Sequence, residues 1–167
     1  MLINIRNHIL HKLASIAPGG GSLRPWLHRR RGVTIGQNVW ISQYVYIDEL
    51  HPEALTIGDN CSIGLRTSIF THFYWGPRRT ENGFGKVIIE DDVFVGPHCV
   101  ILPNVRIGHG SVIKACTVVS RNVPPKVFWG LPAPEALAIV DVPLTSEHEY
   151  HKFLRGLKPI RKKDRKA

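Results

Sequence analysis

The chain of 167 residues is predicted to be all-β, a single-stranded parallel β-helix with short helical flanks. Two observations predict this fold class. Aliphatic residues recur at every sixth position through most of residues 35–119, and a small or β-branched residue follows nearly all of them four positions later. Because six is a multiple of two but not of 3.6, a strand keeps these residues on one face, whereas a helix spreads them around its surface.

The repeat has two interruptions, at residues 48–56 and 73–88. Its twelve aliphatic positions are Ile35, Ile41, Ile47, Ile57, Ile63, Ile69, Ile89, Val95, Ile101, Ile107, Ile113 and Val119. Three residues after an aliphatic position come residue types that tolerate positive φ and therefore suit corners: Asn38, Asn60, Asp92, Asn104, Gly110 and Asn122. Three hexapeptides make one triangular coil, and stacked coils bury a continuous aliphatic column. We therefore expect the coil domain to cover residues 33–134.

Residues 1–32 are expected to form a basic amphipathic helix and a lead-in to the first coil. Apolar residues recur there at intervals of three to four: Leu2, Ile5, Ile9, Leu13 and Ile16. Pro18 and Gly19–Gly21 are expected to end the helix. Two interpretations stay open. The helix either caps the open first coil or rests, together with Arg29–Arg31, on an anionic membrane surface.

The C-terminal extension, residues 135–167, is expected to contain a short helix over residues 145–155 and a basic tail. The formal net charge is +9, and most of the excess lies in the two flanks, with six Lys and Arg residues in 1–32 and eight in 152–167. Charge in the flanks, rather than on a folded reading surface, argues against a nucleic-acid-binding protein.

The three cysteines, Cys61, Cys99 and Cys116, form no CxxC pair. They favour a reducing compartment over a disulfide framework or a zinc site, and we expect them to be buried. No run of 18 apolar residues and no secretory signal is visible. The expected location is therefore cytoplasmic, with peripheral contact at the inner face of the membrane as the alternative for the N-terminal helix.

Three segments carry a resemblance to a known family: IGQNVWISQYVYID, IGDNCSIGLRTSIFTH and IEDDVFVGPHCVILPNVRIGHGSVIKACTVVSRNVPP. They resemble bacterial hexapeptide-repeat O-acetyltransferases, most closely those that act on sugars and surface polysaccharides. The resemblance implies left-handed coils, a homotrimer, and transfer of an acetyl group from acetyl-CoA to a hydroxyl of a sugar or a lipid-linked glycan. It implies no metal.

His72 is the candidate general base. It stands where the repeat breaks into the protruding loop 73–88, and loops that leave a rigid scaffold commonly carry functional groups. A neutral histidine suits removal of a proton from a hydroxyl because its pKa lies near the operating pH. The segment Ile-Phe-Thr-His also resembles the position of the family's catalytic histidine. His98 and His109 lie within uninterrupted repeats and are expected to be solvated corners.

The acceptor is expected to contact the loop and one acidic residue. Tyr74, Trp75 and Arg78 could stack on a sugar ring or pair with a phosphate or carboxylate of a glycan, or the aromatic residues could simply hold the loop in place. Asp48 matches an acidic position that contacts the acceptor in related sugar acetyltransferases, although a local turn suits it equally. The resemblance places the family's site between subunits, so Asp48 and His72 need not meet within one chain.

The resemblance places CoA on the C-terminal coils. Gly96 and Ala115 match small residues beside the groove for the pantetheine arm. Ser120 and Arg121 match a pair of consecutive residues that contacts the 3′-phosphate of the nucleotide in the family. An arginine can bind a phosphate through two donors. Residues 130–134 resemble the Gly-x-Pro-Ala-Lys signature beside the adenine, with a proline in place of the final lysine.

Two other functions fit parts of the sequence. A non-catalytic scaffold would use the N-terminal helix for assembly, but it would not need Ser120 and Arg121, which match a phosphate-binding pair. A zinc carbonic anhydrase of the same fold needs three convergent histidines. Here His72, His98 and His109 stand 26 and 11 residues apart, which does not match that pattern.

Overall fold

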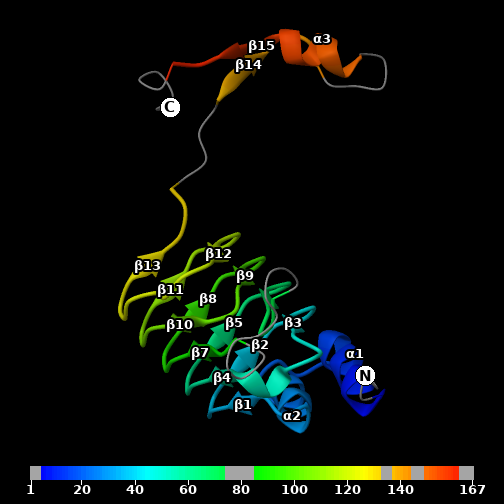
Figure 1. The fold of residues 1–167 in the computed structure, drawn as a ribbon, viewed down its shortest axis with the longest axis vertical. Helices are drawn as coiled ribbons and strands as arrows, with labels where there is room; N and C mark the ends of the chain where they lie inside the picture. Colours follow the sequence, from blue (N-terminus) through cyan, green and yellow to red (C-terminus); the bar gives the residue numbers. More distant parts are fainter. Residues whose placement is uncertain (1–4, 74–84, 133–136, 144–148, 162–167) are drawn as a thin grey trace. The chain divides into compact units, whose positions relative to one another are not determined.

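The computed structural model describes residues 5–73, 85–132, 137–143 and 149–161. The chain divides into two compact units, Met1–Leu131 and Pro132–Ala167. The first unit contains the predicted coils and is shown in blue to yellow in Figure 1.

Three parallel sheets make up most of the first unit, and successive strands enter them in turn (Figure 1). The first sheet has the order β1 (Thr34–Ile35), β4 (Leu55–Ile57), β7 (Val87–Ile89) and β10 (Val105–Ile107). The second has the order β13 (Phe128–Trp129), β11 (Val112–Ile113), β8 (Phe94–Val95), β5 (Ser62–Ile63) and β2 (Trp40–Ile41). The third has the order β12 (Val118–Val119), β9 (Val100–Ile101), β6 (Ser68–Ile69) and β3 (Tyr46–Ile47). The predicted class, parallel strands with few helices, is confirmed.

The pairing register places the predicted aliphatic positions above one another. Ile57 pairs with Ile35 on one side and with Ile89 on the other, and Ile89 pairs in turn with Ile107. All twelve predicted aliphatic positions are buried, and together with the small and β-branched residues between them they form one core. Each coil covers the apolar face of the next, so the stack rather than the single coil is the stable unit.

Most predicted corners have a left-handed backbone, with φ between 52° and 65°. They are Asn38, Asn60, Asp92, Asn104 and Gly110. Asn122 is an exception, because its φ is not positive and its side-chain oxygen accepts a hydrogen bond of 2.8 Å from the backbone N–H of Arg106. The six-residue spacing ends after Val119, and the last positive φ among the described residues is at Lys126 instead.

The cysteines are all free thiols, but they do not share one environment. Cys61 and Cys99 are buried in the core as expected, whereas Cys116 is exposed. The expectation was wrong for Cys116 because this residue occupies a corner, with a φ of 60°, and not an inward-facing position.

Two helices, α1 (Ile5–Ile16) and α2 (Leu23–Arg30), precede the coils, and a short 3-10 helix, η1 (Pro52–Ala54), lies in the first interruption. Helix α1 packs against α2 and β3, but the side that it buries carries His11 and Ala14. The predicted apolar residues of α1 that the structure describes are exposed. Helices α1 and α2 contact the strands of the first coil, as the capping interpretation expects, but the predicted apolar stripe of α1 is not the side that is buried there. Leu2 lies outside the described residues.

In the second unit, strands β14 (Ala138–Val140) and β15 (Leu157–Pro159) form an antiparallel pair, and α3 (Tyr150–Arg155) lies between them in sequence. Helix α3 ends at Arg155, the last residue of the predicted helix, while residues 145–148 of that helix lie outside the described residues. Not one described residue of this unit is buried. In the parts of the chain that the structure describes, no helix has the length and apolar character needed to cross a membrane.

Candidate active site

Two residues that follow neighbouring strands meet where the repeat is interrupted. Asp48 follows β3 and His72 follows β6, and these strands pair in parallel in the third sheet. Nδ1 of His72 lies 2.5 Å from Oδ2 of Asp48. The side chain of His72 is 11% exposed and that of Asp48 is fully buried. The structure thus brings together, within one chain, two residues whose meeting the sequence left open.

The carboxylate of Asp48 is held by backbone amides as well as by the histidine. Its Oδ1 accepts a hydrogen bond of 2.9 Å from the N–H of Leu50, and its Oδ2 accepts one of 2.8 Å from the N–H of Thr71. Burial by itself raises the pKa of Asp48, but these amides and His72 outweigh it and hold the pKa below its ordinary value. Asp48 is therefore an anion at neutral pH.

An anionic acceptor next to Nδ1 selects one tautomer of His72. The carboxylate can only accept a hydrogen bond, so the neutral ring carries its proton on Nδ1. In that tautomer Nε2 is the ring nitrogen that can accept a proton from a substrate. A buried carboxylate also stabilises the imidazolium that forms when Nε2 is protonated. The pair therefore has the chemistry of a general base.

The position of Asp48 differs from the expected contact with the acceptor. Its carboxylate faces Leu50, Thr71 and His72, and none of it reaches the surface. The bond to Leu50 is the local turn that was the alternative interpretation. The other residues expected to contact the acceptor, Tyr74, Trp75 and Arg78, lie outside the described residues.

A buried arginine holds the backbone around Asp48. The Nη2 of Arg31 donates hydrogen bonds to the carbonyls of Ile47 (2.9 Å) and Asp48 (2.7 Å). Its Nε donates to Oδ1 of Asn7 (2.7 Å), and its Nη1 lies 3.0 Å from Nδ1 of His28. Arg31 thus joins α1, α2 and the strand end that carries Asp48.

The charges in this cluster follow from burial. Burial lowers the pKa of Arg31 to about 10, so the guanidinium stays charged at neutral pH. Burial, and then the nearby Arg31 charge, lower the pKa of His28 to about 3, so this imidazole is neutral and can accept the hydrogen bond. Sequence reasoning missed this cluster, because no spacing links residues 28–31 to Asp48.

The expectation that Arg29–Arg31 jointly contact lipid is wrong for Arg31, whereas Arg29 and Arg30 are exposed. Arg31 is buried, and its donors are used inside the protein. Arg29 donates to the carbonyls of Ile35 and Gly36 at the end of β1. Arg30 is exposed, and of the three arginines it is the one whose side chain donates no hydrogen bond within the described residues.

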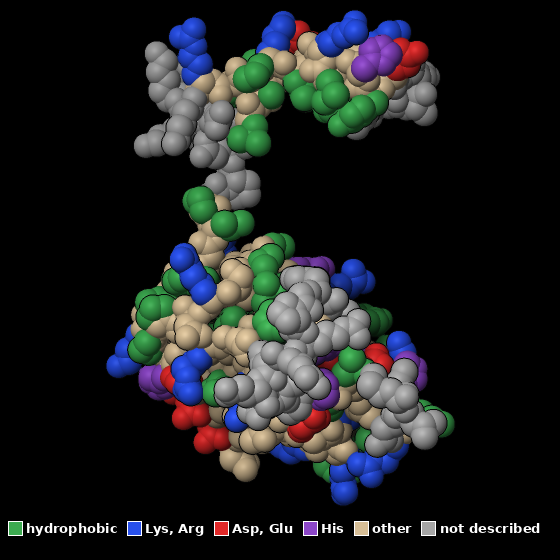
Figure 2. Space-filling model, in the orientation of Figure 1, with side chains coloured by type: hydrophobic (Ala, Val, Ile, Leu, Met, Phe, Trp, Pro, Cys, Tyr) green, Lys and Arg blue, Asp and Glu red, His purple; other side chains and the backbone are tan. Residues whose placement is uncertain are grey.

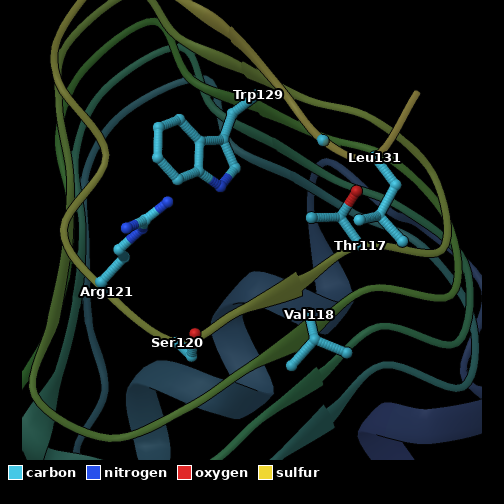
Figure 3. A pocket seen from close by; sticks show the side chains of 7 residues that line it. Thr117, Val118, Ser120, Arg121, Trp129 and Leu131 are labelled. Carbon is cyan, nitrogen blue, oxygen red and sulfur yellow. The ribbon is translucent and has the colours of Figure 1, made fainter.

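A second feature is a pocket of about 370 Å³ beside β12 and β13 (Figure 3). It is lined by Thr117, Val118, Ser120, Arg121, Trp129, Gly130 and Leu131. The guanidinium carbon of Arg121 lies 5.4 Å from the centre of the Trp129 ring. The pocket therefore combines a permanent cation with aromatic and apolar walls.

The pocket contains two of the four residues expected to bind CoA, Ser120 and Arg121. The other two, Gly96 and Ala115, meet on adjacent coils outside its lining. A Cβ on Gly96 would lie 2.5 Å from the backbone nitrogen of Ala115, so only glycine allows this approach. Sequence reasoning missed Trp129, which follows the regular repeat and carries no spacing signal.

The pocket fits the polar and aromatic parts of CoA. Oγ1 of Thr117 is buried and lacks a hydrogen-bond partner among the described residues, and Thr117 lines the pocket. A buried hydroxyl normally has a partner, so a bound molecule with amide or phosphate groups can satisfy it. Arg121 suits a phosphate and Trp129 suits a flat ring. Across the described ranges, no cluster of three or more His, Cys, Asp or Glu residues could hold a metal ion.

Comparisons with known proteins bear on the family and the fold of the chain. Two family models match the chain: "Bacterial transferase hexapeptide (six repeats)" over residues 86–121 and "Hexapeptide repeat of succinyl-transferase" over residues 54–71. YvoF of Bacillus subtilis, an acetyltransferase by name, is 35% identical over 127 residues, which cover 75% of this chain and 72% of YvoF.

Two solved structures are similar as well. A hexapeptide-repeat-containing acetyltransferase of Vibrio cholerae, in complex with acetyl-CoA, has a TM-score of 0.57 and 26% identity, covering 74% of this chain and 79% of its own. A maltose O-acetyltransferase of Clostridium difficile has a TM-score of 0.52 and covers 75% and 80% of the two chains, but at 19% identity it supports the fold alone.

The six-residue repeat, the pocket on the last coils and these relatives define the class of protein as a CoA-dependent acyltransferase. Acetyl-CoA is the molecule bound in the Vibrio cholerae structure. The chain belongs to the hexapeptide-repeat acetyltransferase family.

Proposed function

We propose that the chain is an O-acetyltransferase that moves an acetyl group from acetyl-CoA to a hydroxyl of a sugar or a lipid-linked glycan. The contact between His72 and Asp48 is the observation that carries the proposal. A hydroxyl is a weak acid and needs a base to become a nucleophile. A histidine whose Nδ1 is held by a buried carboxylate is suited to that task.

The proposed reaction proceeds without an acyl-enzyme. Nε2 of His72 removes the hydroxyl proton while the acceptor oxygen attacks the thioester carbonyl carbon and forms the new C–O bond. The resulting tetrahedral oxyanion collapses, and the C–S bond breaks. The proton on His72 passes to the leaving thiolate, which restores the neutral histidine and releases CoA. Asp48 stabilises the imidazolium between the two proton transfers.

On the donor side, the proposal assigns the nucleotide end of acetyl-CoA to the pocket of Figure 3. Arg121 and Ser120 would bind the 3′-phosphate. The pantetheine arm would run past Gly96 and Ala115, where two coils come together. The unpartnered hydroxyl of Thr117 supports this assignment, because it lies in the pocket wall and can bond to the ligand.

On the acceptor side, a glycan is favoured by the resemblance to sugar and polysaccharide O-acetyltransferases and by the residue types that follow His72. Tyr74 and Trp75 can stack on a sugar ring, and Arg78 can pair with a phosphate or carboxylate. Left-handed coils, a homotrimer and a cytoplasmic location complete the proposal. The similarity to hexapeptide-repeat acetyltransferases supports the first two.

The deciding experiment is acetyl transfer to a panel of soluble sugar acceptors by the His72→Ala variant. We expect kcat to fall by about 10²–10⁴-fold, the usual contribution of a general base, while the KM for acetyl-CoA stays close to its original value. His109→Ala is the matched control, because His109 is half exposed and lies at a corner of the coil. Equal turnover by His72→Ala and the unchanged chain would remove His72 from the mechanism.

A further inference from the structure

Helix α1 presents an apolar ridge on the side that faces away from the rest of the unit. Ile5, Ile9, Leu13 and Ile16 are 75%, 52%, 48% and 61% exposed. The opposite side of the helix is buried through His11 and Ala14. Four aliphatic side chains aligned along three turns are unlike the scattered apolar residues of an ordinary surface, and such a ridge indicates a binding surface.

Positive charges border this ridge on both sides. At about 100° per residue, Arg6 and Lys12 lie on opposite flanks of the aliphatic row. Arg6 also donates a hydrogen bond of 3.3 Å to the carbonyl of Arg30 in α2. The guanidinium of Arg30 lies 5.1 Å from the centre of the Trp26 ring, and Trp26 is 47% exposed. These contacts link the basic flank of α1 to an exposed cation and an exposed aromatic ring on α2.

Residues 1–32 contain six Lys and Arg residues and no Asp or Glu. The acidic residue that contacts α1 is Glu49, which follows β3 and pairs with His8 and His11 beside the aliphatic row. Figure 2 shows blue Lys and Arg side chains around the end of the first unit where α1 and α2 lie. We name as the docking face the apolar residues Ile5, Ile9, Leu13, Ile16 and Trp26 with the basic residues Arg6, Lys12 and Arg30.

We propose that the docking face binds the surface of an anionic phospholipid bilayer, with α1 parallel to the membrane plane. A convex ridge of aliphatic side chains can enter the boundary between headgroups and acyl chains, while flanking cations stay among the headgroup phosphates. Trp26 has the ring type that favours this boundary.

The charge pattern favours lipid over a second copy of the chain. Anionic lipid attracts each exposed Lys or Arg near its surface. The exposed parts of five apolar side chains amount to roughly a few hundred Å², below the about 800 Å² per partner of a stable protein interface. Binding to a lipid surface does not require an interface of that area, because the apolar contacts of a short helix and its electrostatic attraction to anionic lipid both contribute to the affinity.

The test is binding of the full chain to phosphatidylcholine vesicles with and without phosphatidylglycerol, measured by co-sedimentation. We expect binding to the vesicles that contain phosphatidylglycerol, weaker binding to the neutral ones, and a decrease as salt is raised. Failure to bind the anionic vesicles would overturn the proposal.

Matched variants separate the apolar and the charged contributions. Ile9→Ser should lower vesicle affinity about tenfold, whereas Leu65→Ser, at an exposed coil position, should not change it. Arg6→Gln with Lys12→Gln should lower it about fivefold for each charge removed. The double control Arg106→Gln with Lys126→Gln removes the same charge from the coils and should have little effect. Equal losses in the test and control variants would contradict the docking face.

Two further measurements make the result specific. Thermal unfolding of the Ile9→Ser variant should match that of the unchanged chain, because the side chain is half exposed. Acetyl transfer to a soluble acceptor should also be unchanged, so failure of the membrane proposal and failure of the proposed reaction are distinguishable. If Ile9→Ser changes the oligomeric mass in solution and leaves vesicle binding intact, α1 is an interface between copies and the proposal is wrong.

Discussion

At the scale of residues, the candidate base depends on a carboxylate that solvent does not reach. Asp48 accepts three hydrogen bonds, from Leu50, Thr71 and His72, and these keep its pKa low in spite of burial. A solvated carboxylate would leave the ring of His72 free to rotate and to exchange tautomers. The buried one orients the ring and places its proton on Nδ1.

The Asp48→Asn substitution tests this role. The side-chain amide introduced at position 48 can donate a hydrogen bond to Nδ1 of His72, which favours the tautomer of His72 that carries its proton on Nε2. In that tautomer Nε2 cannot accept the proton of the substrate. We expect kcat to fall by about 10³–10⁴-fold in steady-state assays, with little change in the KM for acetyl-CoA. Asp92→Asn is the control, because Asp92 lies at an exposed corner near His109. Equal losses in the two variants would assign the effect to general destabilisation.

Arg31 holds the backbone that carries the Asp48 carboxylate, through hydrogen bonds to the carbonyls of Ile47 and Asp48. A lysine keeps the charge but cannot donate from three nitrogens in a fixed plane. We expect Arg31→Lys to lower the free energy of unfolding by about 2–4 kcal/mol in chemical denaturation, since hydrogen bonds to charged groups are lost inside the protein.

The neighbouring Arg30→Lys is the control for Arg31→Lys. Arg30 is exposed, so its replacement should change the free energy of unfolding by less than about 0.5 kcal/mol. If Arg31→Lys is as stable as Arg30→Lys, the buried hydrogen bonds of Arg31 do not stabilise the fold.

At the scale of elements, the contact of α1 and α2 with the coils is unusually polar. Their buried residues include His11, Arg24 and His28, and the buried Arg31 directly follows α2, while the aliphatic ridge of α1 is exposed. Burial lowers the pKa of His28 to about 3, and burial together with Arg31 lowers that of His11 to about 4. Both histidines are therefore neutral in the folded chain at neutral pH.

These shifts predict that stability falls in mild acid. Above pH 6.5, the ordinary value, both histidines are neutral whether the chain is folded or unfolded, so their contribution is constant. Between pH 6.5 and the lowered values, only the unfolded chain binds the protons, and its free energy falls relative to the folded chain. For each pH unit by which the pH falls within this range, each histidine should reduce the free energy of unfolding by up to about 1.4 kcal/mol.

Denaturant unfolding of His11→Gln between pH 4 and pH 6.5 measures this effect. The variant should show a shallower fall in the free energy of unfolding, because one of the two buried titrating groups is gone. The exposed His109→Gln variant should keep the original slope. Identical slopes for all three chains would show that these helices do not couple protonation to unfolding.

At the scale of the whole molecule, stability depends on close approach between coils. Gly96 is the clearest case, because a Cβ there would lie 2.5 Å from the backbone nitrogen of Ala115 and 2.8 Å from the backbone oxygen of Ile113. Backbone atoms of a neighbouring coil cannot move without disturbing the strands that they belong to. An added methyl group would therefore push two coils apart.

Thermal and chemical unfolding of Gly96→Ala should show a loss of about 1–3 kcal/mol, the usual cost of overpacking a core. Gly21→Ala is the matched control, since its added Cβ would lie 3.5 Å from the ring of Trp40, an ordinary contact distance. If the two variants unfold alike, the spacing between these coils is adjustable.

Much of the fold was predictable because its signal is local. A six-residue period is a property of consecutive residues, and the burial of Ile41, Ile63 and Ile101 follows from it directly. Ser120 and Arg121, which line the pocket, were chosen through a resemblance to a short family motif, which is also a local signal. The inward or outward orientation of α1 was not predictable, because its apolar and polar sides can each pack against another element.

The sequence by itself therefore determined the repeating strands, their core and the choice of His72 as candidate base. Only the tertiary structure decided that Asp48 lies against His72, that Arg31 is buried and binds the backbone of Asp48, and that the aliphatic ridge of α1 faces outward. The physical reason is distance along the chain. Asp48 and His72 are 24 residues apart and meet only because β3 and β6 pair in register, which no periodicity within either segment records.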